Sequence, residues 1–377
     1  MKKGTLLIHN GHDYDPGTGA LGVPIIQTST FAKLSFSEDQ EFDYARSGNP
    51  TRKALEETIA LLEGGEYGYA FSSGMAAAAS VLGIFAAGDH IITAADIYGG
   101  TYRIFEVFYK RWGLNHTFVD ASRMEEIEAA LTPQTKAIFV ETPSNPLFKI
   151  TDLKACASFA RAHNLITIVD NTFMTPYLQR PLEAGCDIVI HSATKFLGGH
   201  SDVISGLAVA RNRALGKRIY AVQNSFGAVP GPWDMFLVMR GIKTLKARME
   251  ESQKTALKLA RWLSSDKRVE AVYYPGLDCF PGKAVHEGQA DGPGAVFSFE
   301  TRTEEAAVKF LSSVQYAAAA VSLGGVETIA SYPIRMSHAA VPPLERKKLG
   351  ITGKLIRISA GLEDCDDLME DFDKALS

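Results

Sequence analysis

Short apolar runs alternate with helix-length amphipathic segments through the middle of the chain. Seven of these runs are strand-like: 67–73, 90–95, 116–119, 136–141, 165–170, 187–192 and 205–210. Strands that alternate with helices are typical of a mostly parallel sheet with helices on both faces. The pattern therefore predicts an α/β fold built on a mostly parallel, seven-stranded sheet.

Capping residues mark where helices begin and end. Asn49 followed by Pro50 predicts a helix start, and Gly64 ends the apolar stripe that follows. Ser122 and Glu125 have the spacing of a capping box, so we expect them to cap the next helix.

The N-terminal stretch is different, because it is rich in Gly, Pro, Thr and Asp and shows no sustained periodicity. A structureless segment of this length is unusual inside a compact domain, so we interpret it as an extended arm that packs on a partner or carries function.

After the sheet pattern, a long helical region spans 233–264, with a break or kink predicted near Gly241. Strand-like runs at 295–299 and 355–359 then precede an acidic helix and indicate a smaller C-terminal α+β domain. We expect three parts: an arm, 1–48; a large domain, 49–235; and a linking helix with a C-terminal domain, 236–377.

Composition narrows the class of protein. The chain is 46% hydrophobic and 22% charged with a formal net charge of −4, so no basic surplus indicates nucleic acid or an anionic membrane as partner. Its four cysteines are widely spaced without a C-x-x-C pair, which predicts neither disulfides nor a metal site. The longest apolar run, 76–87, is too short to span a bilayer, so we expect a cytoplasmic protein.

An acid and an amine are predicted at one edge of the sheet. The apolar run 165–170 ends in Asp170, and the run 187–192 leads directly into Lys195. The carboxyl ends of parallel strands are where α/β folds bind ligands. Pyridoxal phosphate needs such a pair: a Lys that bonds to its aldehyde and an Asp that keeps its pyridine nitrogen protonated. Either residue alone is better explained as a surface Lys or a helix cap.

A turn at Ser72-Ser73-Gly74-Met75 follows a strand and opens an apolar helix. Free N–H groups at a helix N-terminus suit a phosphate dianion, and Gly74 lets the backbone approach it closely. An ordinary Ser-Gly turn before a helix is the alternative interpretation.

Several motifs together resemble the pyridoxal-phosphate enzymes of Cys/Met metabolism, in the right order and over nearly the whole chain. They are Tyr44-x-Arg46-x-x-Asn49-Pro50-Thr51, Ser72 to Met75, Tyr98-Gly99-Gly100-Thr101-Tyr102-Arg103, Glu141-Thr142-Pro143-Ser144-Asn145-Pro146, Asp170-Asn171-Thr172-Phe173, Ser192-Ala193-Thr194-Lys195 and Ser322-Leu323-Gly324-Gly325. The resemblance implies the type I fold of these enzymes, which is like that of aspartate aminotransferase.

The resemblance also implies roles at the cofactor. Lys195 would bond to it and move the substrate's Cα proton, Asp170 would pair with the pyridine nitrogen, and Tyr98 would stack on the ring and assist proton transfer. The phosphate would be held by Gly74, Met75, Ser192 and Thr194.

Tyr44 and Arg46 would reach the phosphate in a neighbouring subunit, because family members are homo-oligomers, usually a dimer of dimers. Arg suits this role because its planar fork binds phosphate with two hydrogen bonds.

Arg357 would bind the α-carboxylate of an amino-acid substrate, helped by Asn145 and Ser322. An Arg between apolar strand residues is costly unless an anion pairs with it, so a ligand anion explains it well. A structural salt bridge is the alternative for Arg357.

The reaction is less determined, because β- and γ-elimination use the same lysine. Gly100 departs from the methionine γ-lyase pattern, where a Cys is usual, and Glu327 could meet the distal ammonium of cystathionine unless it is only an exposed loop acid. Residues 170–203 and 331–339 look most like bacterial cystathionine β-lyases. We therefore expect a lyase that converts L-cystathionine to homocysteine, pyruvate and ammonia, with γ-synthase or γ-lyase chemistry as the alternative.

Two other classes stay open: a catalytically silent protein with the same fold, and a sugar aminotransferase. A G-x-G-x-x-G run at 17–22 follows no strand and opens no helix, so we interpret it as a loop and not as a dinucleotide site.

Overall fold

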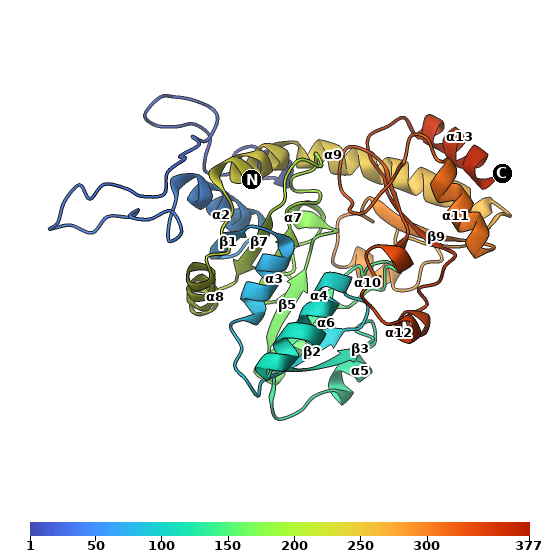
Figure 1. The fold of residues 1–377 in the computed structure, drawn as a ribbon, viewed down its shortest axis with the longest axis horizontal. Coiled ribbons are helices and arrows are strands. Elements are labelled where there is room, and N and C mark those ends of the chain that lie inside the picture. The colour runs from blue at the N-terminus through green and yellow to red at the C-terminus, as the bar shows by residue number, and fades with distance from the viewer.

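Seven strands form the larger sheet in the computed structural model, which describes residues 1–377 (Figure 1). They are β1 (Tyr67–Phe71), β2 (His90–Ala94), β3 (Asn115–Val119), β4 (Thr135–Glu141), β5 (Ile166–Asp170), β6 (Ile188–Ser192) and β7 (Gly206–Ala210). Their order across the sheet is β1-β7-β6-β5-β4-β2-β3. Each strand is one of the seven predicted runs, so the prediction of a seven-stranded sheet is confirmed.

The sheet is mostly parallel, with one departure. The pairings from β3 to β6 are parallel, whereas β7 runs antiparallel to both β6 and β1. The link from β6 to β7 carries Lys195 and contains no crossover helix. A connection without a crossover cannot return the chain to a parallel position, so β7 reverses.

Helices cover both faces of this sheet, because successive strand residues point to opposite sides. Ala70 packs in one core with Leu55 of α2, while the next residue, Phe71, packs in the other with Val81 of α3. The helices and helical turns are α1 (Lys3–Leu6), α2 (Pro50–Glu63), α3 (Gly74–Leu82), α4 (Gly99–Arg103), η1 (Ile104–Phe108), η2 (Tyr109–Trp112), α5 (Met124–Ala129), α6 (Leu153–Ala162), α7 (Thr175–Leu178), α8 (Arg213–Phe226), α9 (Pro232–Ser265), α10 (Lys283–Glu287), α11 (Glu304–Ser313), η3 (Pro333–Arg335), α12 (Pro343–Lys348) and α13 (Cys365–Leu376).

A second sheet belongs to the C-terminal part. Its five strands, in the order β10-β11-β12-β9-β8, are β8 (Val269–Tyr273), β9 (Val296–Thr301), β10 (Ala318–Ala319), β11 (Ile329–Ser331) and β12 (Leu355–Ser359). The sequence predicted only β9 and β12, which are its buried central strands. The others are short or partly exposed, and so they lack a continuous apolar run.

The long helix α9 lies along both parts of the molecule and is unbroken over its 34 residues (Figure 1). The predicted break near Gly241 is therefore wrong. A Cβ atom at this position would lie 2.2 Å from the carbonyl oxygen of Gly198 and 2.4 Å from that of Leu197. Gly241 thus allows the helix to pack closely against the segment that follows Lys195.

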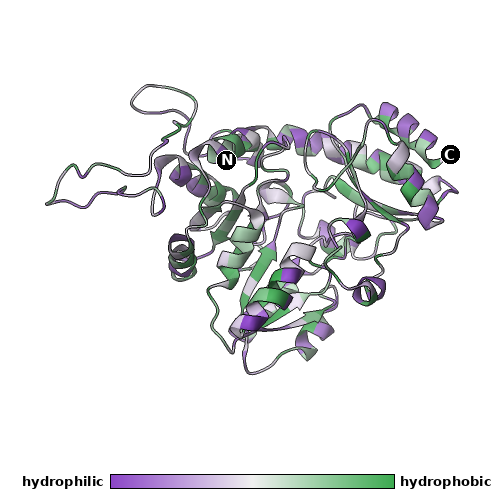
Figure 2. Ribbon diagram, in the orientation of Figure 1, coloured by the Kyte–Doolittle hydropathy of each residue, from purple (hydrophilic) through white to green (hydrophobic).

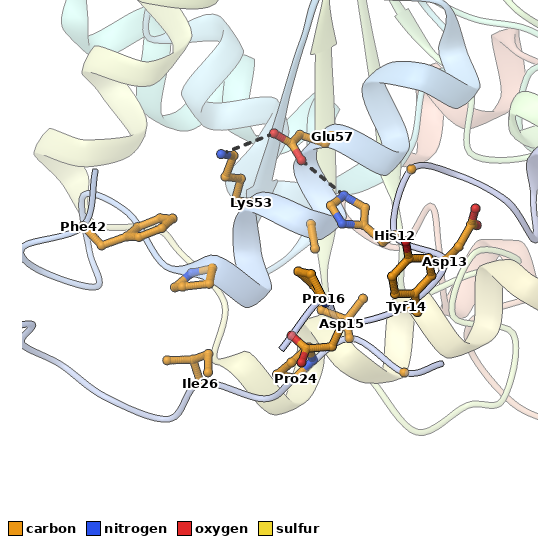
Figure 3. A pocket seen from close by; sticks show the side chains of 15 residues that line it. His12, Asp13, Tyr14, Asp15, Pro16, Pro24, Ile26, Phe42, Lys53 and Glu57 are labelled. Carbon is orange, nitrogen blue, oxygen red and sulfur yellow. Dashed lines mark ion pairs between the residues drawn. The ribbon is translucent and has the colours of Figure 1, made fainter. Parts of the chain in front are cut away.

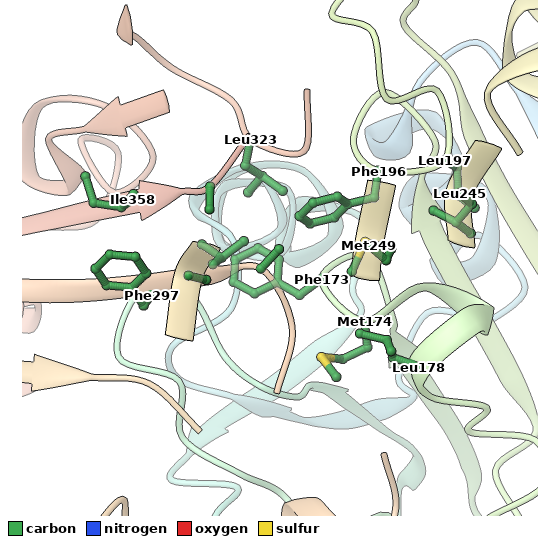
Figure 4. Close-up of a cluster of buried hydrophobic side chains, with 14 of the residues drawn as sticks. Phe173, Met174, Leu178, Phe196, Leu197, Leu245, Met249, Phe297, Leu323 and Ile358 are labelled. Carbon is green, nitrogen blue, oxygen red and sulfur yellow. The ribbon is translucent and has the colours of Figure 1, made fainter. Parts of the chain in front are cut away.

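One continuous core joins the two sheets. It includes Phe173 and Phe196 from the larger sheet's loops, Met249 of α9, and Phe297 and Ile358 of the smaller sheet (Figure 4). Apolar segments gather on the strands and on the inward helix faces, and polar ones lie outward (Figure 2). This shared core holds Lys195 and Arg357 at fixed positions relative to each other.

The capping prediction for α5 is also wrong. The helix begins after Arg123, and neither Ser122 nor Glu125 caps it. Instead the Asp120 carboxylate accepts hydrogen bonds from the N–H and hydroxyl of Ser122, and Glu126 accepts from the Asp120 N–H at 2.9 Å. Asp120 competes successfully for the serine because a carboxylate is the stronger acceptor. The predicted start of α2 is confirmed, since Asn49 accepts from the N–H groups of Thr51 and Arg52.

Apart from α1, residues 1–48 contain no helix and form long loops that project from the body of the molecule (Figure 1). Several large apolar side chains of these loops are exposed, including Leu34 and Phe36 at 89% and 94%. None of the helices is both long and apolar enough to cross a membrane.

Candidate active site

A cavity of about 390 Å³ lies at the carboxyl edge of the larger sheet, closed on one side by the C-terminal part. Ten of the thirteen predicted site residues line it: Gly74, Met75, Tyr98, Asn145, Asp170, Ser192, Thr194, Lys195, Ser322 and Arg357. Tyr44, Arg46 and Glu327 do not. The structure therefore brings together side chains that lie up to 283 positions apart in the printed sequence, from Gly74 to Arg357.

Asp170 and Lys195 both reach this cavity from neighbouring parallel strands, as the sequence predicted. Asp170 is the last residue of β5, and its Oδ1 accepts hydrogen bonds from the hydroxyl and N–H of Thr172 at 2.5 and 3.1 Å. Lys195 follows β6, and its Nζ donates to the Ser322 hydroxyl at 2.5 Å. An amine and an oriented carboxylate that line one cavity suit an aromatic aldehyde with a basic ring nitrogen.

The start of α3 is shaped for a phosphate. A Cβ atom on Gly74 would lie 2.7 Å from the Cβ of Ser192, so only glycine fits here. The Ser73 side chain caps the helix by accepting from Ala76 N–H, while the N–H groups of Gly74 and Met75 have no hydrogen-bond partner within the chain. Two free N–H groups at a helix N-terminus, with the Ser192 hydroxyl opposite, form a site for a dianion. These residues fit pyridoxal phosphate.

Arg357 is buried at 2% exposure and has no carboxylate within ion-pair distance. Its guanidinium donates to Asn145 Oδ1 at 3.0 Å, to the Ser322 carbonyl at 2.7 Å and to Ser331 Oγ at 3.2 Å, and its Nε has no partner. The alternative of a structural salt bridge is therefore wrong. A buried cation that faces a cavity and lacks a counter-ion is suited to bind an anionic ligand such as a carboxylate.

Tyr98 leads into α4 at the mouth of the cavity, with 43% of its surface exposed. Its ring lies so close to Gly100 that a Cβ atom there would be 2.5 Å from a ring carbon and 2.8 Å from Met75 Sδ. A cysteine at this position would have to displace the Tyr98 ring or Met75. The absence of a side chain at Gly100 thus determines where the tyrosine sits.

Glu327 lies just outside the first cavity. It lines an adjoining hollow of about 590 Å³ that shares Thr194, Ile204, Val321 and Ser322 with the first cavity. Its carboxylate accepts from the Ser201 hydroxyl at 3.1 Å. It is therefore placed to meet the far end of a long substrate rather than the reacting atoms.

Tyr44 and Arg46 sit on the projecting loops, with the Arg46 guanidinium 5.6 Å from the centre of the Tyr44 ring. Near them, another hollow of about 630 Å³ separates the arm from α2 (Figure 3). It holds the ion pairs of Glu57 with His12 and Lys53, and none of the predicted site residues line it. The arm residues thus do not complete the Lys195 cavity within their own chain.

Burial, together with the nearby positive charge of Arg357, lowers the pKa of Lys195 to about 8. The unfolded chain binds a proton at Lys195 up to about pH 10.5, whereas the folded chain loses it near pH 8. The buried charge therefore destabilises the cofactor-free protein below about pH 8, and the penalty disappears as the pH rises toward 10.5.

We expect the cofactor-free Lys195→Met variant to be more stable than the wild type near pH 7, by up to about 3 kcal/mol, because each pKa unit is worth about 1.4 kcal/mol. The gap should shrink to about 1.4 kcal/mol near pH 9.5, where the unfolded chain still binds most of its proton. Urea unfolding of both proteins at the two pH values measures this, with Lys254→Met on the surface as control. An unchanged gap would contradict the buried-amine interpretation.

Sequence reasoning missed two further polar side chains at the site. Glu141 ends β4 directly beside Asp170 in the strand register, and Thr172 orients Asp170. Two acids that end neighbouring parallel strands were a visible signal for Glu141.

Behind the site, His191 Nε2 lies 2.7 Å from Glu63 of α2, and both side chains are fully buried. His191 is thus a local hydrogen-bonding residue.

Comparison with known proteins agrees with this site. The family described as Cys/Met metabolism PLP-dependent enzyme matches residues 4–377. Cystathionine beta-lyase MetC of Bacillus subtilis is 52% identical over 99% of this chain and 95% of its own, and cystathionine gamma-lyase of the same organism is 50% identical over 100% and 99%. The crystal structure of cystathionine gamma-lyase from Lactobacillus plantarum with L-serine is 44% identical, covers 100% of this chain and 98% of its own, and has a TM-score of 0.97.

Proposed function

This chain belongs to the Cys/Met metabolism PLP-dependent enzymes, and on that premise we propose that it cleaves the Cβ–S bond of L-cystathionine. One molecule of water is consumed, and the products are homocysteine, pyruvate and ammonia. The observation that carries the proposal is that Lys195, Asp170 and Arg357 line one cavity, in a chain 52% identical to a cystathionine beta-lyase.

Each residue has a task that its position supports. When bound, pyridoxal phosphate supplies an electron sink that acidifies the substrate's Cα–H bond. Arg357 and Asn145 bind the substrate α-carboxylate, which orients Cα toward Lys195. Lys195 removes the Cα proton, because an amine whose pKa lies near 8 is a usable base at neutral pH. The bond to sulfur at Cβ then breaks, and homocysteine leaves toward the Glu327 hollow.

The direct test is incubation of the cofactor-loaded protein with L-cystathionine and identification of the ketoacid by mass. Pyruvate supports the proposal. 2-Oxobutyrate would show γ-elimination instead, which is the second candidate because gamma-lyases are 50% and 44% identical to this chain. Ammonia released together with pyruvate would separate lyase activity from amino transfer, since amino transfer passes the amino group to an acceptor and releases no ammonia.

We further propose that Glu327 recognises the distal ammonium of cystathionine. Glu327→Gln should raise KM for cystathionine about three- to tenfold with little change in kcat, because a partly exposed charge pair is worth about 1 kcal/mol. The control is an S-alkyl cysteine without a distal ammonium, whose KM should be unchanged. An equal rise for both substrates would show that Glu327 acts only on the shape of the cavity.

The arm leads to a second proposal, that the active unit is a homo-oligomer, a dimer of dimers in the cytoplasm, in which Tyr44 and Arg46 serve the partner's phosphate site. Their own chain leaves them outside the Lys195 cavity, and the arm exposes large apolar side chains. Arg46 can bind a phosphate with two charged hydrogen bonds, so its partner site would gain affinity for the cofactor.

Joint refolding of two variants tests whether Arg46 of one chain serves the cofactor site of its partner. After joint refolding, Arg46→Ala and Lys195→Ala chains should recover part of the wild-type activity, because hybrid oligomers contain some sites with both residues intact. Joint refolding of Asp170→Asn with Lys195→Ala is the control and should recover nothing, since both residues come from one chain. No recovery in the first mixture would place Arg46 outside the shared site.

A further inference from the structure

A second carboxyl group, that of Glu141, lies beside Asp170 in the cofactor cavity. Glu141 ends β4 and Asp170 ends β5, and the two are direct partners in the parallel register. Both line the cavity, and Glu141 is 6% exposed. The cofactor needs only one carboxylate at its ring nitrogen, so Glu141 requires another explanation.

The hydrogen bonding of Glu141 points to Tyr98. The one hydrogen bond of its side chain is accepted by Oε2 from the Tyr98 backbone N–H, at 2.9 Å. This N–H lies at the start of α4, where no side chain of the helix itself provides a cap. Glu141 therefore holds the residue whose ring covers the cavity, and Gly100 leaves that ring its place.

The surrounding charges do not favour an ionised Glu141. The titratable groups around it are Asp170, Asp96, Arg357 and Tyr98, with Lys195 on the same cavity, and none forms an ion pair with it. Burial raises the pKa of Glu141 well above its usual range, and the negative charges of Asp170 and Asp96 add to this, whereas the Tyr98 N–H and Arg357 oppose it. An acid carbonyl oxygen still accepts the Tyr98 hydrogen bond.

We propose that Glu141 is a positioning residue that holds Tyr98 over the bound cofactor through its hydrogen bond to the Tyr98 backbone N–H. The inference rests on the proposed function in one respect only, that pyridoxal phosphate binds in this cavity. Asp170 is then the single carboxylate at the ring, and Glu141 acts through the tyrosine without a charge of its own. An ionised Glu141 would instead repel Asp170 across adjacent strands.

Conservative and truncating variants separate these roles. In the holoenzyme, Glu141→Gln keeps an oxygen acceptor of the same reach, so kcat/KM should stay within about threefold and the acid limb of its pH profile should not move. Glu141→Ala removes the acceptor, so the tyrosine is no longer held over the cofactor, and kcat/KM should fall about 10- to 100-fold. The visible circular dichroism of bound cofactor, recorded without substrate, should change in Glu141→Ala and persist in Glu141→Gln.

A double-mutant cycle with Tyr98→Ala tests whether Glu141 acts through the tyrosine. If it does, Glu141→Ala should cost less than about threefold in the Tyr98→Ala background. Fully additive losses would overturn the proposal, as would a Glu141→Gln enzyme as impaired as Glu141→Ala or one with a shifted acid limb. Because the dichroism needs no substrate, a protein that binds cofactor but does not release pyruvate would refute only the proposed reaction.

Discussion

Replacement of Lys195 by alanine should lower the turnover of cystathionine by at least about 10⁴-fold, since general-base catalysis alone contributes about 10²–10⁴ and the bond to the cofactor is lost as well. The same variant should lose the cofactor's visible absorbance band after gel filtration. Lys195 is the only lysine on the cavity, so no neighbouring amine can replace it. Ser322, its hydrogen-bond partner, has no basic nitrogen.

Borohydride reduction gives an independent measurement. In the wild type, the reduced protein should carry the cofactor mass on the peptide that contains Lys195, and in Lys195→Ala no peptide should carry it. Lys254→Ala, on the exposed face of α9, is the matched control and should label at Lys195 with full activity. A Lys195→Ala protein that retained labelling or more than about one per cent of turnover would place the reactive lysine elsewhere.

Asp170→Asn should reduce kcat/KM by about 10²–10³-fold while leaving the fold intact. The amide oxygen can still accept both Thr172 hydrogen bonds, so the local structure is kept. The other amide atom is a donor, which cannot pair with a protonated ring nitrogen. Burial raises the pKa of Asp170 in this chain, and the bonds from Thr172 oppose that rise. A positively charged ring nitrogen would favour the carboxylate strongly.

The measurements are kcat, KM and the visible spectrum of bound cofactor across pH. The loss should fall mainly on kcat, because the ring nitrogen that Asp170 keeps protonated draws in the electron pair that forms only during the reaction. Thr172→Ser, which keeps the hydroxyl, is the control and should stay within about threefold of wild type. If Asp170→Asn raised KM alone, Asp170 would be a binding residue without a role at the ring nitrogen.

Local interactions explain why much of the fold was predictable from the sequence. Strand runs such as 165–170 are buried on both faces, so their apolar continuity is visible without knowing their neighbours. Asn49 caps α2 through N–H groups only two and three residues away. Asp170 and Lys195 were predicted at one edge because parallel strands in a βαβ unit leave their carboxyl ends on the same side.

Features that depend on distant contacts could not be predicted in the same way. Gly241 looked like a helix breaker, and only the approach of the Gly198 carbonyl shows why the residue is small. Ser122 matched a capping box, but the Asp120 carboxylate binds it instead. In both cases the local pattern was present, but a contact with another part of the structure determined which conformation formed.

By itself, the sequence determined the strands of the larger sheet, the principal helix start and the residues that could attach a cofactor, because these depend on near neighbours and on residue chemistry. Only the tertiary structure decided that Arg357 lacks a counter-ion, that Glu141 supports Tyr98 and that Glu327 lies in an adjoining hollow. Each of these depends on which side chains meet across the two sheets. Long-range packing brings these side chains into contact, and the local periodicity of the sequence does not specify such contacts.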